Sequence, residues 1–517
     1  MTQGALQANG PASGEPSIGS MAFPRIVRCV LVALACTLCT AATASAAPVL
    51  VMREDGSVVR HRHSPAPDVT FPAVRSAADQ GRSEPTAAAA AKRRTVIGEL
   101  DRLRTAGAID DATYAERRAA YEDAKRTVKK LSGARKVELG AVVSTLEDIA
   151  ARGQLAASRL APLFLTLQRN REWWTNGPLL APGRRVGFSG SQIVWQYYPR
   201  AGIQIQVLGT FGKVNALWSS RQTTALGQAV DELLPLAAER AGGVAWEYYF
   251  PYRAGKAPWV SSLAQGTALQ ALSRAATRLK RQDEVFAVTS RGLGIFERAA
   301  PEGVRVPAGA GTHYAQYSFE PGLRILNGFI QSLVGLYDYG RLAADDRAKA
   351  LFATGEARAR EEVPTYDTGA WSLYSRGTVT HESDLGYHTL LRDFLTSLCN
   401  RAKIETYCGA EAHFTSYLST APVVHVGSRR LRGGTYGKLK MSLSKISGVT
   451  LRITRGEKLV HTRYVGTLSY GSHTLGWQVP RRRGSYTVTL AVRDLAGNTA
   501  SATGDIEVLK PRKRKRG

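Results

Sequence analysis

The chain has 517 residues, 44% of them hydrophobic, so it can bury the cores of roughly two to four domains and is no single small domain. Its 69 Lys and Arg residues outnumber 42 Asp and Glu residues, which gives a formal net charge of +27 at pH 7. This charge attracts polyanions such as acidic glycans, teichoic acids or nucleic acid, and does not by itself choose among them.

An export signal is the first feature along the chain. In residues 1–46, two arginines precede an apolar run from Val30 to Leu38, and the small-residue sequence Ala44-Ser45-Ala46 follows. This order is typical of a cleaved signal peptide, with Met21 as the expected start. An uncleaved anchor is the alternative, although the run is shorter than the roughly 20 residues that span a bilayer. We therefore expect a secreted, cell-surface or cell-wall protein and no nucleic-acid partner.

Two cysteines remain after the signal region, Cys399 and Cys408. In the oxidising compartment of an exported protein, this close pair favours a local disulfide over a metal site. No group of His, Cys and Asp residues has metal-ligand spacing, and neither a P-loop nor a G-x-S-x-G sequence occurs. We expect no metal and no cofactor.

Two kinds of sequence follow the signal region. Residues 47–90 are rich in Ala, Pro, Ser and Arg, and they predict a flexible linker after one strand-like piece at 49–52. Residues 91–165 have apolar residues at spacings of three and four, which predicts a helical hairpin or a small bundle. Asp110 or Asp111 is the expected cap of its second helix.

In residues 166–212 the helical pattern gives way to a pattern typical of β-strands. β-branched and aromatic residues alternate there with polar ones, including the run 203–211, and Gly and Pro break the pattern. We expect a small β-sheet region.

Residues 213–415 return to a helical pattern with a repeat. Broad apolar stripes start near Leu263, Leu326 and Leu390, and each interval is long enough for two helices and two loops. Repeated helical hairpins that cannot bury their faces alone suggest an α/α toroid, here an incomplete (α/α)6 barrel. Such a toroid has a funnel that is lined by the loops before its inner helices.

The C-terminal part differs in kind. Across residues 420–510, short runs with period two are separated by Gly, Asn or Asp turns, which predicts an immunoglobulin-like β-sandwich with a turn at 493–498. The basic tail at 511–517 is expected to attach weakly to a cell-wall polyanion. A homodimer is a further partner that the sequence leaves open.

Five sequence blocks in the helical region carry a family resemblance. They run from Pro258 to Gly266, from Leu326 to Asp338, from Leu351 to Gly355, from Tyr366 to Gly369 and from Tyr387 to Thr389. In this order and spacing they resemble the C-terminal domain of the D-glucuronyl C5-epimerase family. The resemblance covers about residues 245 to 400. It implies a toroid enzyme that inverts C5 of a hexuronic acid residue, of the glucuronate/iduronate type, in an acidic polysaccharide.

The resemblance also implies roles for individual residues. The catalytic tyrosines of the family fall on Tyr374 and Tyr387, and a third tyrosine falls on Tyr317. Arg376 is the nearest match to the carboxylate-binding arginine, and Gln316 stands where the family has a glutamate. The further substrate-binding candidates are Glu320, Asn327, Arg324, Tyr252, Arg253, Trp259, Gln265 and His388. A tyrosine can remove the C5 proton if nearby positive charge lowers its pKa from ~10.

Two other functions stay open at this point. Toroids also host uronate lyases, which start with the same proton abstraction and then expel the linked sugar. The other hypothesis is a non-catalytic glycan-binding or wall-organising protein, because Gln316 stands where the family has a glutamate. Several polar residues in the same blocks can instead have a purely structural role. Asp338 and Asp367 can be helix caps, and Ser261 and Ser262 can form the cap of another helix. Asn327 and Gly328 can form a packing contact.

Overall fold

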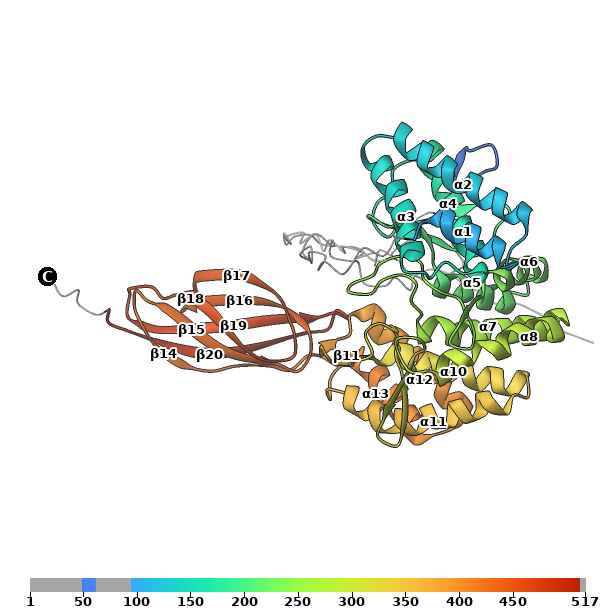
Figure 1. Ribbon diagram of the computed structural model, residues 1–517. Coiled ribbons are helices and arrows are strands. Elements are labelled where there is room, and N and C mark those ends of the chain that lie inside the picture. The colour runs from blue at the N-terminus through green and yellow to red at the C-terminus, as the bar shows by residue number, and fades with distance from the viewer. Residues whose placement is uncertain (1–48, 62–93, 512–517) are drawn as a thin grey trace, which may run out of the picture. The chain divides into compact units, whose positions relative to one another are not determined.

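The computed structural model describes residues 49–61 and 94–511 (Figure 1). The signal region, most of the predicted linker and the basic tail after residue 511 lie outside the described residues. The described chain consists of a helical region followed by a β-rich C-terminal region, so the protein is multidomain. Among the described residues, no helix is long and apolar enough to cross a membrane.

Four helices form where the sequence pattern predicts a hairpin. They are α1 (Val96–Thr105), α2 (Asp111–Lys130), α3 (Gly133–Ala151) and α4 (Ala157–Asn176). The Asp110 side chain caps α2 by accepting a hydrogen bond from the Thr113 N–H at 2.7 Å, as predicted. Two glycines with positive φ, Gly133 at 55° and Gly153 at 66°, interrupt the pattern at further points. This is why one periodic stretch yields four helices.

A five-stranded sheet contacts α3 and α4 through its last strand, and its strand order is β2-β1-β3-β4-β5. The strands are β1 (Val49–Met52), β2 (Val58–His61), β3 (Arg185–Phe188), β4 (Trp195–Tyr198) and β5 (Gly202–Ile205). β1 confirms the predicted strand. β2 lies where the sequence predicts a linker, because its pairing with β1 supplies hydrogen bonds that composition does not reveal.

The stretch 203–211 is strand only in its first part. Helix α5 (Val207–Ser219) starts inside it, since the Gln206 side chain accepts a hydrogen bond from the Gly209 N–H at 3.1 Å. The region 166–212 is also helical at its start, where α4 runs to Asn176. The predicted β-sheet region is therefore shorter than expected at both ends.

The helical region is built from pairs of consecutive helices. The pairs are α5 with α6 (Thr223–Leu233), α7 (Ser262–Leu279) with α8 (Gln282–Gly292), α10 (Leu326–Leu342) with α11 (Asp346–Glu362), and α12 (Leu385–Ala402) with α13 (Glu405–Tyr417). Helix α10 packs between α7 and α12, and α7 also packs against α5. The predicted disulfide is present, and Cys399 and Cys408 join α12 to α13.

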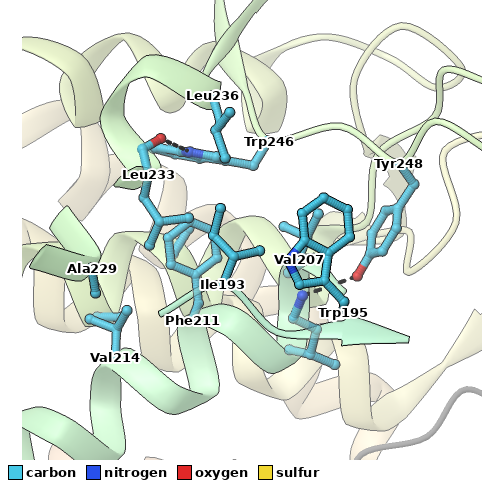
Figure 2. Packing of buried hydrophobic residues seen from close by; sticks show 14 of the residues in the cluster. Ile193, Trp195, Val207, Phe211, Val214, Ala229, Leu233, Leu236, Trp246 and Tyr248 are labelled. Carbon is cyan, nitrogen blue, oxygen red and sulfur yellow. Dashed lines mark hydrogen bonds between the residues drawn. The ribbon is translucent and has the colours of Figure 1, made fainter. Parts of the chain in front are cut away.

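Buried aromatic residues connect α5 and α6 to the segment that contains Trp246 and Tyr248 (Figure 2). Phe211 of α5 lies against Trp246, with ring centroids 5.1 Å apart. The Trp246 indole N–H donates to the Leu233 carbonyl at 2.8 Å, so this loop is held to the end of α6. Tyr248 accepts a hydrogen bond from the Leu208 N–H at 3.2 Å.

Helices α7 and α10 are in backbone contact. A Cβ at Gly335 would lie 2.0 Å from the Gly266 carbonyl oxygen, and a Cβ at Gly266 would lie 2.6 Å from the Ser332 Cα. Asp338 of α10 is a polar link and not a cap, because its carboxylate accepts from Arg274 of α7 at 2.9 Å and from Arg401 of α12 at 2.6 Å. The three helices are thus fixed to one another.

Short strands connect the helices. They are β6 (Ala238–Arg240) with β7 (Gly243–Ala245), β8 (Arg305–Ala308) with β9 (Gly311–Tyr314), and β10 (Leu323–Ile325), β11 (Leu373–Gly377) and β12 (His381–Glu382) in one sheet. Two 3-10 turns, η2 (Leu234–Leu236) and η3 (Val363–Tyr366), and the short helix α9 (Gly294–Glu297) complete this region.

Two sheets share one core in the C-terminal region. One contains β13 (Val424–Val426), β15 (Tyr436–Leu443) and β18 (Gly471–Gln478). The other contains β14 (Arg429–Arg432), β20 (Thr499–Leu509), β19 (Gly484–Asp494), β16 (Ser447–Arg455) and β17 (Lys458–Leu468). The alternation in the sequence is confirmed, because Val449, Leu451 and Ile453 are all buried. The predicted turn at 493–498 joins β19 to β20.

Candidate functional site

Four tyrosines from separate segments meet in the helical region. Tyr374 lies on β11, Tyr387 lies in the first turn of α12, Tyr317 follows β9, and Tyr252 lies in the loop before α7. The ring centroids of Tyr374 and Tyr387 are 4.6 Å apart, and those of Tyr252 and Tyr317 are 5.5 Å apart. The three tyrosines predicted to be catalytic are therefore brought together, and Tyr252 joins them.

Local structure positions two of these side chains. Tyr374 lies in β11 next to the residues that pair with β10, at an irregularity in the pairing of β11 with β12 between Leu373 and Ser375. At the start of α12, the Asp384 side chain accepts a hydrogen bond from the Tyr387 N–H at 2.7 Å. This N-cap sets the position of Tyr387 on the helix.

The four tyrosine side chains lie close together in a row. Tyr387 lies near enough to Tyr374, Tyr374 to Tyr317, and Tyr317 to Tyr252 for each to affect the pKa of its neighbour. We call these four residues the tyrosine relay. Tyr252 and Tyr317 are only 3% and 1% exposed, whereas Tyr374 and Tyr387 are half-buried. The relay thus runs from a partly exposed end to a buried end, and connected hydroxyls can pass a proton along the row.

Burial controls the acidity of the relay. It raises the pKa of Tyr374 to about 12, while the neighbouring polar side chains of Gln316 and Tyr317 and the charge of Arg253 act in the opposite direction. Burial also raises the pKa values of Tyr387, Tyr317 and Tyr252. The nearby positive charge does not bring these pKa values below the ordinary value, because loss of solvent outweighs it. The four hydroxyls are protonated at neutral pH.

Arg253 is the cation that acts on the relay. It follows Tyr252 in a turn closed by hydrogen bonds between Tyr252 and Gly255, and its φ of 53° is in the left-handed region that glycine normally occupies. Its guanidinium pairs with Glu320 at 3.1 Å, and the two side chains are 42% and 22% exposed. The ion pair lies beside the relay, since both charges affect the pKa of Tyr252. Strained residues of this kind cluster at functional sites.

Arg376 has other contacts. Its Nη1 donates to the Thr365 carbonyl at 2.5 Å, and its guanidinium lies 6.0 Å from the centre of the Tyr366 ring. Arg324 faces Arg376 across the β10–β11 pair, and its Nη1 is 3.9 Å from Glu362. The structure therefore places Arg376 and Arg324 beside Tyr366.

Two buried amides lie next to the tyrosines. The Asn327 Nδ2 donates to the Tyr387 carbonyl at 3.1 Å, and the Gln316 side chain lies near enough to Tyr374 to act against the rise of its pKa. Gln316 Oε1 and Asn327 Oδ1 have no hydrogen-bond partner among the described residues, although these side chains are only 3% and 1% exposed. A buried acceptor without a donor is costly, so both oxygens are suited to accept from a hydroxyl of a bound molecule.

Two other candidate residues, Gln265 and Trp259, make contacts within the protein itself. The Gln265 amide donates to the Trp246 carbonyl at 2.8 Å and accepts from the Trp246 N–H at 3.2 Å. Trp259 is 1% exposed, and its ring stacks on Tyr248 with centroids 4.3 Å apart. Both side chains build the wall that carries Tyr252. The predicted cap is confirmed nearby, since the Ser261 hydroxyl accepts from the Ala264 N–H at 3.4 Å.

His388 holds the two tyrosine segments together. Its ring stacks on Trp371 at 3.7 Å, its Nδ1 lies 2.8 Å from the Ser372 hydroxyl, and its Nε2 lies 2.9 Å from the Phe414 carbonyl. Burial lowers the pKa of His388 to about 4, so the ring is neutral and Nε2 donates. Asp367 is likewise structural, and accepts from the Gly369 N–H and the Tyr417 hydroxyl.

Sequence reasoning missed two residues near the relay. Tyr198 on β4 is 6% exposed, burial raises its pKa, and the charges of Tyr252 and Arg185 both act on it. Arg185 on β3 is 7% exposed. The only sequence signal was the aromatic run 193–199, which also fits an ordinary buried strand. Within the described ranges, no three His, Cys, Asp or Glu side chains are arranged to hold a metal ion.

The part of the chain that contains the tyrosine relay also matches a known protein family. Residues 241–416 match the family described as D-glucuronyl C5-epimerase C-terminus. This segment is therefore similar to the C-terminal domain of the D-glucuronyl C5-epimerase family. A D-glucuronyl C5-epimerase of Caenorhabditis elegans is 28% identical over 150 residues, which are 26% of this chain and 24% of that relative. The chain therefore spans about a quarter of the length of this relative.

Solved structures show weaker likenesses. A sugar epimerase from a ruminal bacterium has 8% sequence identity and a TM-score of 0.35, over 50% of this chain and 70% of that chain. The cellobiose 2-epimerase of Bacillus thermoamylovorans has 9% identity and a TM-score of 0.34, over 56% of this chain and 76% of that chain. TM-scores this low do not establish a shared fold.

Proposed function

We propose that the protein is a polysaccharide C5-epimerase that inverts C5 of hexuronic acid residues by proton transfer through tyrosines. The observation that carries this proposal is the tyrosine relay, in which side chains from four separate segments of the family-matched region lie together beside Arg253. A C5 proton next to a carboxylate is very weakly acidic, so its removal needs a base, a proton donor and a cation.

The proposed reaction uses the exposed end of the relay. Tyr374 first gives its hydroxyl proton to solvent. The resulting phenolate takes the C5 proton, and the electron pair of the C–H bond moves into the carboxylate, which becomes enolate-like. Arg253 exchanges Glu320 for this carboxylate and stabilises its added charge. Tyr387 returns a proton to the other face of C5 and recovers one from Tyr374, so no net proton is gained or lost. Because the two rings are in contact, they must separate to admit the sugar.

The buried amides fit the same proposal. The free oxygens of Gln316 and Asn327 would accept hydrogen bonds from sugar hydroxyls and orient the ring over Tyr374. Gln316 replaces the glutamate of the family, and we propose that the relay itself supplies the missing proton-transfer group.

The proposal also includes the fold of the two main regions and the export of the protein. The consecutive helix pairs from α5 to α13 support an α/α toroid over about residues 213–415. The two sheets with a shared core support an immunoglobulin-like domain over about 420–510. The Cys399–Cys408 disulfide supports export to an oxidising compartment, where the substrate would be an acidic polysaccharide.

Hydrogen exchange at C5 tests the proposed function. In heavy water, the protein should incorporate deuterium at C5 of a glucuronate-containing oligosaccharide without producing the near-ultraviolet absorbance of a lyase product. Tyr374→Phe and Tyr387→Phe should each lower the exchange rate at least about tenfold with the fold retained. Tyr464→Phe, an exposed tyrosine of the C-terminal region, is the matched control. Unchanged exchange in both relay variants would contradict the assignment.

A further inference from the structure

One end of the C-terminal two-sheet region is strongly basic. At this end β14 finishes with Arg432 opposite Leu509 of β20, and β19 starts with Gly484 opposite Val508. The loop between β18 and β19 and the turn between β16 and β17 meet there, because Arg455 Nη2 donates to the Arg483 carbonyl at 3.3 Å. We call six exposed residues at this place the basic end: Arg432, Lys458, Arg481, Arg482, Arg483 and Lys510.

The charges of the basic end are not neutralised. Among the residues that the structure describes, none of these six side chains makes an ion pair or a side-chain hydrogen bond. Of the nearby acidic residues, Glu507 is already paired with Arg430 at 2.7 Å. Three consecutive arginines, Arg481 to Arg483, lie in one short loop. Such a cluster costs repulsion in the free protein, and an anionic ligand would relieve it.

The surface there is hollowed. A cavity of about 920 Å³ is lined by basic side chains that include Arg429, Arg483 and Lys510, with Asp505 and Glu507 on its wall. This volume is large enough for sugar residues. Guanidinium groups bind carboxylates through paired hydrogen bonds, and an acidic side chain can accept from a sugar hydroxyl.

An exposed aromatic ring adjoins the basic end. Tyr436 is 66% exposed at the start of β15, and the preceding Thr435 carbonyl accepts from the Val479 N–H at 2.9 Å, just before the arginine loop. Its ring lies across Gly476, where an added Cβ would be 1.9 Å from the Tyr436 oxygen. The glycine therefore lets the ring lie flat on the sheet with one face open. A flat aromatic face next to cations suits a sugar ring that carries a carboxylate.

We propose that the basic end and Tyr436 bind a second segment of an acidic polysaccharide, separate from the tyrosine relay. The arginines bind carboxylates of the chain, and Tyr436 packs against one sugar face. This inference rests on the proposed function for the identity of the polymer. A second attachment point raises the effective concentration of a long chain at the relay, so it favours long substrates over short ones.

Binding by the full-length protein tests this site directly. The probe is hyaluronan, a glucuronate polymer, with its carboxyl-reduced form as the uncharged chain of equal length. Replacing Arg481, Arg482 and Arg483 together by Ala should weaken hyaluronan binding at least about tenfold at low salt. The matched control, Lys440→Ala with Arg452→Ala and Arg493→Ala, removes three exposed charges elsewhere on the same region and should weaken binding less than about threefold. Equal losses in both triple variants would overturn the proposal.

Two further binding experiments distinguish a glycan site from a surface that binds any polyanion. Tyr436→Ala should weaken hyaluronan binding, whereas Tyr464→Ala, which removes a ring that is 64% exposed, should not. Carboxyl-reduced hyaluronan should not bind. Duplex DNA or anionic lipid vesicles that bind as tightly as hyaluronan, with no effect of Tyr436→Ala, would also overturn the proposal.

Enzyme kinetics keep this inference distinct from the proposed function. The triple arginine variant should raise KM for long polymers and leave C5 exchange in a short oligosaccharide unchanged, with an unaltered thermal unfolding curve. If the short substrate shows no exchange even in the unmodified protein, the proposed function fails while the binding result still stands.

Discussion

Gly328 of α10 lies directly against the side chain of Gln316. A Cβ added at residue 328 would be 2.6 Å from Gln316 Oε1 and 2.9 Å from the Gln316 Cβ. The helix can approach the buried amide this closely because residue 328 has no side chain. The Asn-Gly pair inside an apolar helix is therefore explained by the residue it faces, and that residue acts on the pKa of Tyr374.

A methyl group at this contact should disturb the site. Gly328→Ala should displace Gln316 from Tyr374, lower C5 exchange at least about fivefold and reduce the free energy of unfolding by about 1–3 kcal/mol. Gly340→Ala is the control on the same helix, where the added Cβ meets the Lys349 Cγ at 3.1 Å, and it should leave exchange unchanged. Urea unfolding and deuterium incorporation measure the two effects. Full exchange in Gly328→Ala would show that Gln316 does not position Tyr374.

The buried end of the relay can be tested with a matched pair of tyrosines. Tyr252→Phe should lower C5 exchange at least about tenfold, because it removes the last hydroxyl of the row. Tyr248→Phe removes an equally buried hydroxyl, which accepts from the Leu208 N–H outside the relay, and should keep exchange. Each variant should lose about 1–3 kcal/mol of stability. A similar loss of exchange in both variants would mean that damage to the fold is responsible.

His388 should make stability depend on pH. Its folded pKa of about 4 is below the ordinary value of 6.5, so the unfolded chain takes up the proton first as pH falls. Its contribution is complete above about pH 6.5 and is lost as pH drops toward 4, a loss of about 3 kcal/mol in the free energy of unfolding. Denaturant unfolding at a series of pH values measures this. His388→Gln should flatten the curve in this window, and an unchanged slope would place the titration on another group.

Asp338 should be important for stability. Asp338→Asn weakens its links to Arg274 and Arg401, which connect α7, α10 and α12, and leaves two half-buried guanidinium groups without full compensation. We expect a loss of about 3 kcal/mol in the free energy of unfolding. Asp346→Asn breaks an exposed pair with Lys349 and should cost less than about 0.5 kcal/mol. Comparable losses in the two variants would show that the Asp338 network contributes little.

Regular patterns and short-range chemistry were predictable from the sequence. The alternation of Val449, Leu451 and Ile453 determined the faces of a strand, because a strand repeats every two residues. The close pair Cys399 and Cys408 predicted the disulfide for a similarly local reason. The convergence of Tyr374 and Tyr387 was expected through the family blocks.

Contacts between distant segments were not predictable. Arg376 is two residues from Tyr374 and shares its strand face, yet its guanidinium reaches Thr365. Arg253 was among the predicted substrate-binding residues, but its effect on the pKa of Tyr374, from a turn far away in the chain, was not predicted. The raised pKa values depend on the burial of whole side chains, which sequence spacing does not measure.

The contact between Gly266 and Gly335 has a mechanical consequence. Where these glycines meet, the two backbones touch with no side chain between them, so this part of the contact between α7 and α10 is stiff. The loop before α7 and the segment after β9 are held by side chains instead, since Gly255 packs against the Phe319 ring and Arg253 pairs with Glu320. Because these two contacts couple both loops, the loops should shift together as one compliant wall.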